Sequence, residues 1–235
     1  NDEVLVYDGV NPLSRLQNSH YPAVDVCAPG LGGVLAPIVS DDNSTATYAQ
    51  YGGTSQSTPL VAALAALILS VNSCLQSQDV AYIIKSTTDA IPDAGSYPGM
   101  YGTGRINAFK ACSLATSYGN LPPITENTTW NNYHYVNDEL QVHSGATLTI
   151  TGTEVHFSQQ GSIIVEPGAK LVLEGCTLTS KCGMWRGIQL LGNPNAPQGT
   201  LDNSVQGIIS INGSLIENAH EGIMLGGFGS DYLSK

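Results

Sequence analysis

The chain has 235 residues, enough for one large domain or two modest ones. Charged residues make up 11% of it and the net charge is −11, with only eight Lys and Arg, so no basic patch can form to bind nucleic acid or an anionic membrane. Its 26 glycines and few charges are typical of secreted β-rich proteins whose solubility rests on neutral polar groups.

The first fifty residues predict two short strands and a long loop. No signal peptide is visible in the acidic start of the chain. Residues 4–7 predict a strand that ends at a turn signal, and residues 23–28 predict a second, which ends at Pro29 and Gly30. Because residues 23–28 are apolar on both faces except at Asp25, we expect them to be buried in a parallel sheet. Residues 31–50 predict a loop with room for a hairpin.

A glycine pair, a serine and a proline then open an apolar helix at residues 60–71. Glycines allow a sharp turn, and Pro59 loses no needed hydrogen bond in a first helical turn. The run is shorter than the roughly 20 residues of a membrane span, so it predicts a buried helix. Ser55 would lie at the helix N-terminus, where free N–H groups and the dipole favour negative charge. The local pattern fits either an N-cap serine on a core helix or a nucleophile.

Two further helices close the first half of the chain. Residues 79–87 predict one that Ser77 or Gln78 would cap, and residues 108–115 predict another capped by Asn107. Near residue 120 the composition shifts to prolines and an aromatic cluster, which predicts a domain boundary. We therefore expect a first domain over residues 1–118, a linker over 119–136 and a second domain over 137–235.

The second domain contains a repeat of 23 residues. Gly145 and Gly152 recur as Gly168 and Gly175, with aliphatic residues at matching positions between them. The turn at Gly152 and Gly175 recurs again at 213, and residues 185–190 are echoed by residues 220–225. Short strands broken by glycine at a fixed period predict a right-handed parallel β-helix, whose coils stack to share one core. A β-sandwich with accidental similarity is the alternative. No polar cap follows, so we expect the solenoid to be truncated.

Five cysteines, an odd number, fit either a reducing or an oxidising compartment, and we favour an oxidising one. The candidate pairs are Cys74 with Cys112 and Cys176 with Cys182. Cys27 would then remain as a small buried strand residue.

Three motifs of the first half resemble those of the subtilisin-like serine proteases, or subtilases, in the family's order and at close to its spacing. They are V-D-V-C-A-P-G at residues 24–30, G-T-S-Q-S-T-P at 53–59 and G-T-G-R-I-N-A at 102–108. The resemblance spans residues 4–115 and implies the C-terminal part of an α/β catalytic domain with a parallel sheet. Leu60 and Ala63 stand where the family often has histidine and glycine, and we interpret both as packing variants.

By this resemblance Ser55 is the catalytic nucleophile, its backbone N–H is an oxyanion-hole donor, and Thr54 supports that hole. The family's triad runs Asp, His, Ser, so the Asp, the His and the oxyanion Asn should lie upstream of this chain, which alone should be inactive. His20 precedes Ser55 but has no base motif around it. The resemblance thus implies part of a secreted or cell-surface serine endopeptidase, a hydrolase that acts on a protein or peptide substrate.

No metal site is assigned from the sequence. His134, His143, His156 and His220 lack metal-ligand spacing, and a solvated acidic turn at Asp41-Asp42 is favoured over a structural calcium loop. We expect no cofactor, no nucleic-acid partner and no membrane span, and a surface polymer or protein as the ligand of the β-helix. One alternative function is a non-catalytic surface or carbohydrate-binding β-helix protein with an inactive protease remnant. A polysaccharide lyase is another, with Arg186 as its weak support.

Overall fold

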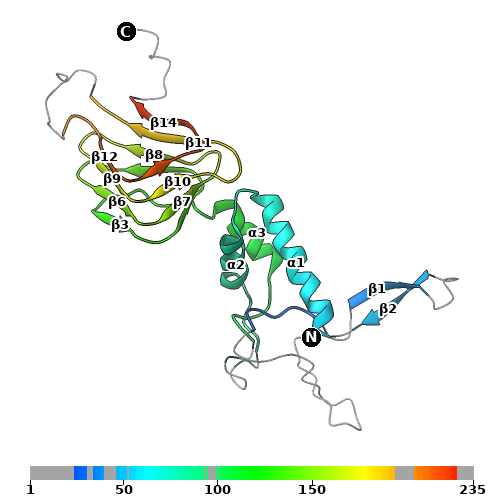
Figure 1. Cartoon of the computed structure of the whole chain (residues 1–235). Helices are drawn as coiled ribbons and strands as arrows, with labels where there is room; N and C mark the ends of the chain where they lie inside the picture. The colour runs from blue at the N-terminus through cyan, green and yellow to red at the C-terminus, as the bar shows by residue number, and fades with distance from the viewer. Residues whose placement is uncertain are drawn as a thin grey trace. The chain divides into compact units, whose positions relative to one another are not determined.

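The computed structural model describes residues 24–30, 34–39, 46–51, 53–92, 94, 99, 101–193 and 204–226. The chain divides into two compact units, Asn1–Thr116 and Ser117–Lys235 (Figure 1). The first unit combines helices with strands and the second is built from parallel sheets, and each is described by itself. The predicted strand at residues 4–7 lies outside the described residues.

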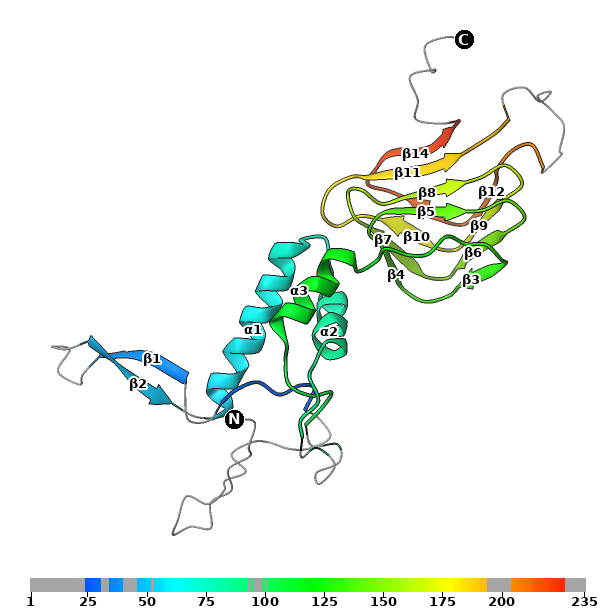
Figure 2. The same ribbon diagram turned by 180° about the vertical axis from the view of Figure 1, so that it is seen from behind.

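Among its described residues, the first unit holds one antiparallel hairpin and three helices. Strands β1 (Val34–Val39) and β2 (Ala46–Tyr51) pair antiparallel, which confirms the predicted hairpin. The helices are α1 (Thr54–Val71), α2 (Ser77–Ser86) and α3 (Ala108–Ser117). In both views α2 and α3 lie alongside α1 (Figures 1 and 2).

Helix α1 is longer and more exposed than predicted. It begins at Thr54, so Pro59 lies inside the helix and not in its first turn. Only Leu64 and Ile68 of α1 are buried, and the prediction of a fully buried helix is therefore wrong for the described structure. The reason is that α2 covers a single i, i+4 stripe of the helix. By length and composition alone α1 could cross a membrane, although the start of the helix is polar; the absence of a membrane span stays a prediction.

Local side-chain bonds fix the starts of α2 and α3. The Gln76 N–H donates to Asp79 Oδ2 at 2.8 Å in a capping box, so α2 starts two residues earlier than predicted and Gln76, not Ser77 or Gln78, is its cap. At α3 the predicted cap is confirmed, because the Lys110 N–H donates to Asn107 Oδ1 at 3.0 Å.

Residues 24–28 do not form the predicted buried strand. Only Cys27 pairs, in a parallel bridge with Arg105, and the side chains of residues 24–28 are half-buried or exposed. The Cys27 N–H donates to the Gly104 carbonyl at 2.8 Å, and the Ile106 N–H donates to the Cys27 carbonyl at 2.9 Å. One bridge leaves most of this segment outside any ladder, so burial on both faces does not arise.

Neither predicted disulfide is present. Cys112 and Cys176 hold free thiols, so the pairs Cys74–Cys112 and Cys176–Cys182 are wrong. Cys27 is also a free thiol, half-buried, and its Sγ lies 3.5 Å from the Tyr101 carbonyl. Burial raises the pKa of the Cys27 thiol above its ordinary value, which makes the thiol less reactive at neutral pH.

As far as the structure describes it, the second unit consists of three parallel sheets of four strands each; Figure 2 shows their stacked strands. Consecutive strands enter different sheets, and each strand pairs with the third strand along the chain; we call one pass through the three sheets a round. The first two rounds are β3 (Thr128–Trp130), β4 (His134–Val136), β5 (Glu139–Val142), β6 (Thr147–Thr151), β7 (Glu154–Phe157) and β8 (Ser162–Val165). The last two are β9 (Lys170–Glu174), β10 (Thr177–Thr179), β11 (Trp185–Leu190), β12 (Ile208–Asn212), β13 (Leu215–Ile216) and β14 (Ala219–Leu225). Residues 119–136, predicted as a linker, hold β3 and β4.

The strand register follows the repeat in the sequence. Thr147 lies opposite Lys170, which is one 23-residue period further on. Leu173 lies opposite Ile211, at the larger spacing that the third glycine turn predicts. Near Gly187 the register of β11 and β14 shifts at a bulge. The repeated glycines all have positive φ, for example 60° at Gly152, a conformation that favours glycine.

One aliphatic core fills the second unit. Its members alternate along the strands with half-buried or exposed residues, as the pattern iBiBi of β6 illustrates. Phe157 and Trp185 stack in this core with ring centroids 3.9 Å apart. The Trp185 Nε1–H donates to the Glu217 carbonyl at 2.9 Å, which satisfies the one polar atom of that buried ring.

Candidate active site

The segment around Gly30 lies against the N-terminus of α1. The Gly53 N–H donates to the Gly30 carbonyl, and the Ser57 hydroxyl donates to the Pro29 carbonyl at 3.3 Å. A Cβ on Gly30 would overlap Ser57 Oγ and lie 2.8 Å from the Gly53 carbonyl oxygen. Two of the three sequence motifs therefore meet here, and the contact requires glycine.

The third motif pairs with the first through backbone groups. The Thr103 N–H donates to the Asp25 carbonyl at 3.0 Å, next to the Cys27 bridge. Gly102 has φ 58° and a Cβ there would overlap the Asp25 backbone. Gly104 has φ 132° and a Cβ there would overlap the carbonyl of Asp89. Both glycines of the motif are thus explained by close backbone approach.

Ser55 is an exposed residue in the first turn of α1, one position after Thr54. The N-cap is Gly53, with φ 130°, so Ser55 is not the helix cap. In the part of the chain that the structure describes, the Ser55 N–H and hydroxyl have no hydrogen-bond partner. Pro59 also has no N–H to donate to the Ser55 carbonyl. The first turn of α1 thus presents an unpaired N–H and a hydroxyl together, where the helix dipole favours negative charge.

Thr54 lies beside Ser55 and is also exposed. Its carbonyl accepts a bond from the Thr58 hydroxyl at 3.0 Å, and the Gln56 N–H donates to the Gly53 carbonyl at 3.1 Å. These bonds hold the first turn without using the Ser55 groups.

No histidine that could act as the catalytic base is among the described residues of the first unit. His20 lies outside them, and the other four histidines belong to Ser117–Lys235. The candidate calcium loop at Asp41 and Asp42 also lies outside the described residues. Within the residues that are described, no cluster of three or more His, Cys, Asp or Glu could hold a metal ion.

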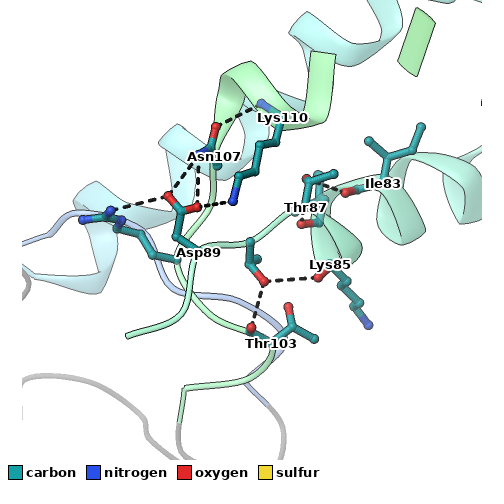
Figure 3. A network of polar contacts seen from close by, with 10 residues as sticks. Ile83, Lys85, Thr87, Asp89, Thr103, Asn107 and Lys110 are labelled. Atoms are coloured by element: carbon teal, nitrogen blue, oxygen red, sulfur yellow. Dashed lines mark hydrogen bonds and ion pairs between the residues drawn. The ribbon is translucent and has the colours of Figure 1, made fainter. Parts of the chain in front are cut away.

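Asp89 is the centre of a polar network that the sequence did not predict (Figure 3). Its carboxylate accepts from Lys110 Nζ at 2.7 Å, from Asn107 Nδ2 at 3.0 Å and from Arg105 at 3.5 Å. The backbones of Asp89 and Arg105 also exchange two bonds, at 2.7 and 2.9 Å. The network ties the segment after α2 to the third motif and to the cap of α3, and no sequence motif marks Asp89.

Stability at low pH should depend on Asp89. Its hydrogen bond with Lys110, and next that with Asn107, lower the pKa of this carboxyl below its ordinary value. A lowered folded-state pKa stabilises the fold above the unfolded pKa of about 4, and this stability is lost as the pH falls through the folded value. We therefore expect acidification from pH 6 to pH 3 to lower the thermal midpoint less in Asp89→Asn than in the unmodified chain.

Circular dichroism at 222 nm is the measurement for this effect, because all three helices described belong to the first unit. Glu126→Gln, at an exposed carboxylate of the second unit, is the control and should retain the pH dependence of the unmodified chain. Equal pH dependence in Asp89→Asn and the unmodified chain would contradict the assignment.

Comparison with known protein families finds a match within the first unit. Residues 8–109 match the Subtilase family. The segment contains all three motifs in full, and the match supports a serine-type peptidase at the level of the family.

Three proteins of similar sequence have names that refer to proteases. Over 71 residues the chain is 48% identical to the "Calcium-dependent protease" of Trichormus variabilis, covering 28% of this chain and 11% of that protein. It is 36% identical over 88 residues to "Thermitase" of Thermoactinomyces vulgaris, covering 37% of this chain and 28% of that protein. It is 38% identical over 95 residues to the "Extracellular protease" of Xanthomonas campestris pv. campestris, covering 39% of this chain and 16% of that protein. The chain thus spans less than a third of each relative, and no solved structure matches it.

Proposed function

We propose that Ser55 is the acyl-transfer nucleophile of a serine endopeptidase. This chain would supply the C-terminal part of the catalytic domain. The triad aspartate and histidine, and the asparagine of the oxyanion hole, would come from sequence that precedes Asn1 in the full-length protein. The observation that carries the proposal is the exposed first turn of α1, where the unpaired N–H and hydroxyl of Ser55 lie together inside a segment that matches the subtilases.

The reaction follows from these groups. Ser55 Oγ attacks the carbonyl carbon of a peptide bond as the histidine takes its proton, and the Ser55 N–H donates to the oxyanion that develops. The amine leaves with that proton, and a water molecule then hydrolyses the acyl-enzyme. Thr54 supports the oxyanion hole, and its carbonyl is already engaged by Thr58.

Labelling of the full-length protein with a fluorophosphonate tests this assignment. We expect an adduct in the unmodified protein and none in Ser55→Ala. Ser70→Ala is the matched control, since Ser70 lies on the same helix, is exposed, and its hydroxyl donates to the Leu67 carbonyl at 2.7 Å. An adduct that persists in Ser55→Ala would refute the role of Ser55. No adduct in any variant would favour the non-catalytic alternative, a surface or carbohydrate-binding protein with an inactive remnant.

We also propose that the second unit is a right-handed parallel β-helix that binds a surface polymer or a protein. The support is the 23-residue period of both the sequence and the strand register, with every third strand paired. Secretion or display at the cell surface is part of the same proposal, and the relative named "Extracellular protease" supports it. Another relative is named calcium-dependent, but we assign no cofactor to this chain.

A further inference from the structure

The start of α1 has the residues for a capping bond but does not form it. In such a bond the N–H of the N-cap residue donates to the side chain of the third helical residue, N3. Helix α2 forms it, because the Gln76 N–H donates to Asp79 Oδ2 at 2.8 Å. In α1 the N-cap is Gly53 and Gln56 stands at N3, yet no side-chain bond caps the helix. The two helices therefore use the same pair of positions differently.

The side-chain oxygen of Gln56 is left without a donor. Gln56 Oε1 is closed off from solvent and has no hydrogen-bond partner among the described residues. It lies beside the cap residue, 3.5 Å from the position that a Cβ on Gly53 would take. A buried acceptor without a donor lowers the stability of the folded state. Another interaction of Gly53 must therefore outweigh the bond that these two residues could make.

The competing acceptor is the carbonyl of Gly30. The Gly53 N–H donates to it, with Gly53 at φ 130°, far from the extended conformation of an ordinary N-cap. The Ser57 hydroxyl donates to the neighbouring Pro29 carbonyl at 3.3 Å and holds the same segment. Glycine adopts both conformations without a steric penalty. A change of φ at Gly53 can therefore move its single N–H from Gly30 to Gln56.

We propose that Gly53 and Gln56 form a hydrogen-bond switch that sets the position of Ser55. In the state described, the Gly53 N–H bonds to Gly30 and joins the first sequence motif to the second. In the alternative state, the same N–H bonds to Gln56 Oε1, which caps the helix and releases Gly30. Ser55 lies between the two switch residues in sequence, so its N–H and hydroxyl move with them. Gln56 is thus a positioning residue, and this consequence for Ser55 rests on the proposed function.

A double-mutant cycle tests the switch. Gln56→Met keeps the length of the side chain but removes its acceptor, so in the unmodified chain it should lower the equilibrium constant of unfolding. Gly53→Ala disfavours the φ of 130° and thereby drives the switch to the alternative state; its Cβ would meet Gln56 Oε1 at 3.5 Å, an ordinary contact. In that background Gln56→Met should raise the equilibrium constant of unfolding, because it now removes a helix cap.

Urea denaturation followed by circular dichroism at 222 nm gives these equilibrium constants. The effects of Gln56→Met in the two backgrounds should have opposite signs and differ by about tenfold. Ser70→Ala, in the last turn of α1, is the matched control and should have the same effect in both. The same sign for Gln56→Met in both backgrounds would overturn the proposal. Should Gly53→Ala fail to fold, Gly30→Ala takes its place, because its Cβ would overlap Ser57 Oγ and break the contact.

The rate at which a fluorophosphonate labels the full-length protein tests the consequence for Ser55. Gly53→Ala should slow labelling by about tenfold or more, because it displaces the nucleophile. Adding Gln56→Met should recover about threefold of that loss, because the competing acceptor is gone. A labelling rate that Gly53→Ala leaves unchanged would show that the switch does not position Ser55. No labelling of any variant or of the unmodified protein would refute the proposed function instead, whereas the reversal of sign in the unfolding experiment would still support the switch.

Discussion

On the proposed function, replacing Ser55 by alanine is expected to lower the kcat of peptide hydrolysis by the full-length protein by about 10⁶-fold, with little change in KM. This magnitude is the loss seen in subtilisin when its nucleophilic serine is removed. The split between kcat and KM follows because Ser55 Oγ forms a bond in the reaction, whereas a methyl group in its place leaves peptide binding intact. Steady-state hydrolysis of a chromogenic peptide by the full-length protein is the measurement.

Folding must be separated from chemistry in this experiment. Ser55 is exposed and makes no hydrogen bond to the described residues, so its alanine variant should have the thermal midpoint of the unmodified protein. Ser70→Ala should change kcat by less than about twofold. If Ser55→Ala keeps more than a tenth of the activity, the nucleophile lies elsewhere.

The strand pairing of the second unit could be predicted from sequence because its cause is periodic. Gly145 and Gly168 mark the same turn one period apart, and the aliphatic residues that follow them must face one core. Leu148 and Leu171 therefore lie in register as the repeat predicts. The shift near Gly187 could not be predicted, because a bulge adds one residue without changing the pattern of apolar positions.

In the first unit the motifs predicted which segments come together at the candidate site, but not which of their residues are buried. The hydrophobic run of α1 indicates a buried helix, yet burial depends on what packs around it, and only one stripe through Leu64 and Ile68 is covered. The two disulfides failed for a similar reason, since the distance between two cysteines depends on the fold and not on their spacing in sequence.

The site was likewise predictable only in part. Glycines at 30, 53 and 102 belong to motifs; close backbone contacts explain why glycine is needed at 30 and 102, and a φ of 130° explains it at 53. Asp89 belongs to no motif, and its importance arises from Asn107 and Lys110, which come from a later segment of the chain. A carboxylate whose partners are distant in sequence leaves no local signal.

Leu173→Ala is expected to lower the free energy of unfolding of the second unit by about 2–5 kcal/mol. Leu173 is fully buried, in register between Ile150 and Ile211 on the neighbouring strands. Truncation to alanine removes the transfer free energy of the lost methyl and methylene groups and leaves a cavity, which the rounds above and below cannot close without breaking their shared register. The effect should therefore lie well above that of an ordinary surface substitution.

Urea denaturation followed by tryptophan fluorescence measures this loss in the second unit alone, because both tryptophans of the chain, Trp130 and Trp185, belong to it. Val172→Ala is the matched control: Val172 is the neighbour of Leu173 on β9, points away from the core and is half-buried, so its loss should cost less than about 1 kcal/mol. Equal costs for the two variants would mean that the alternation along β9 does not separate core residues from surface residues.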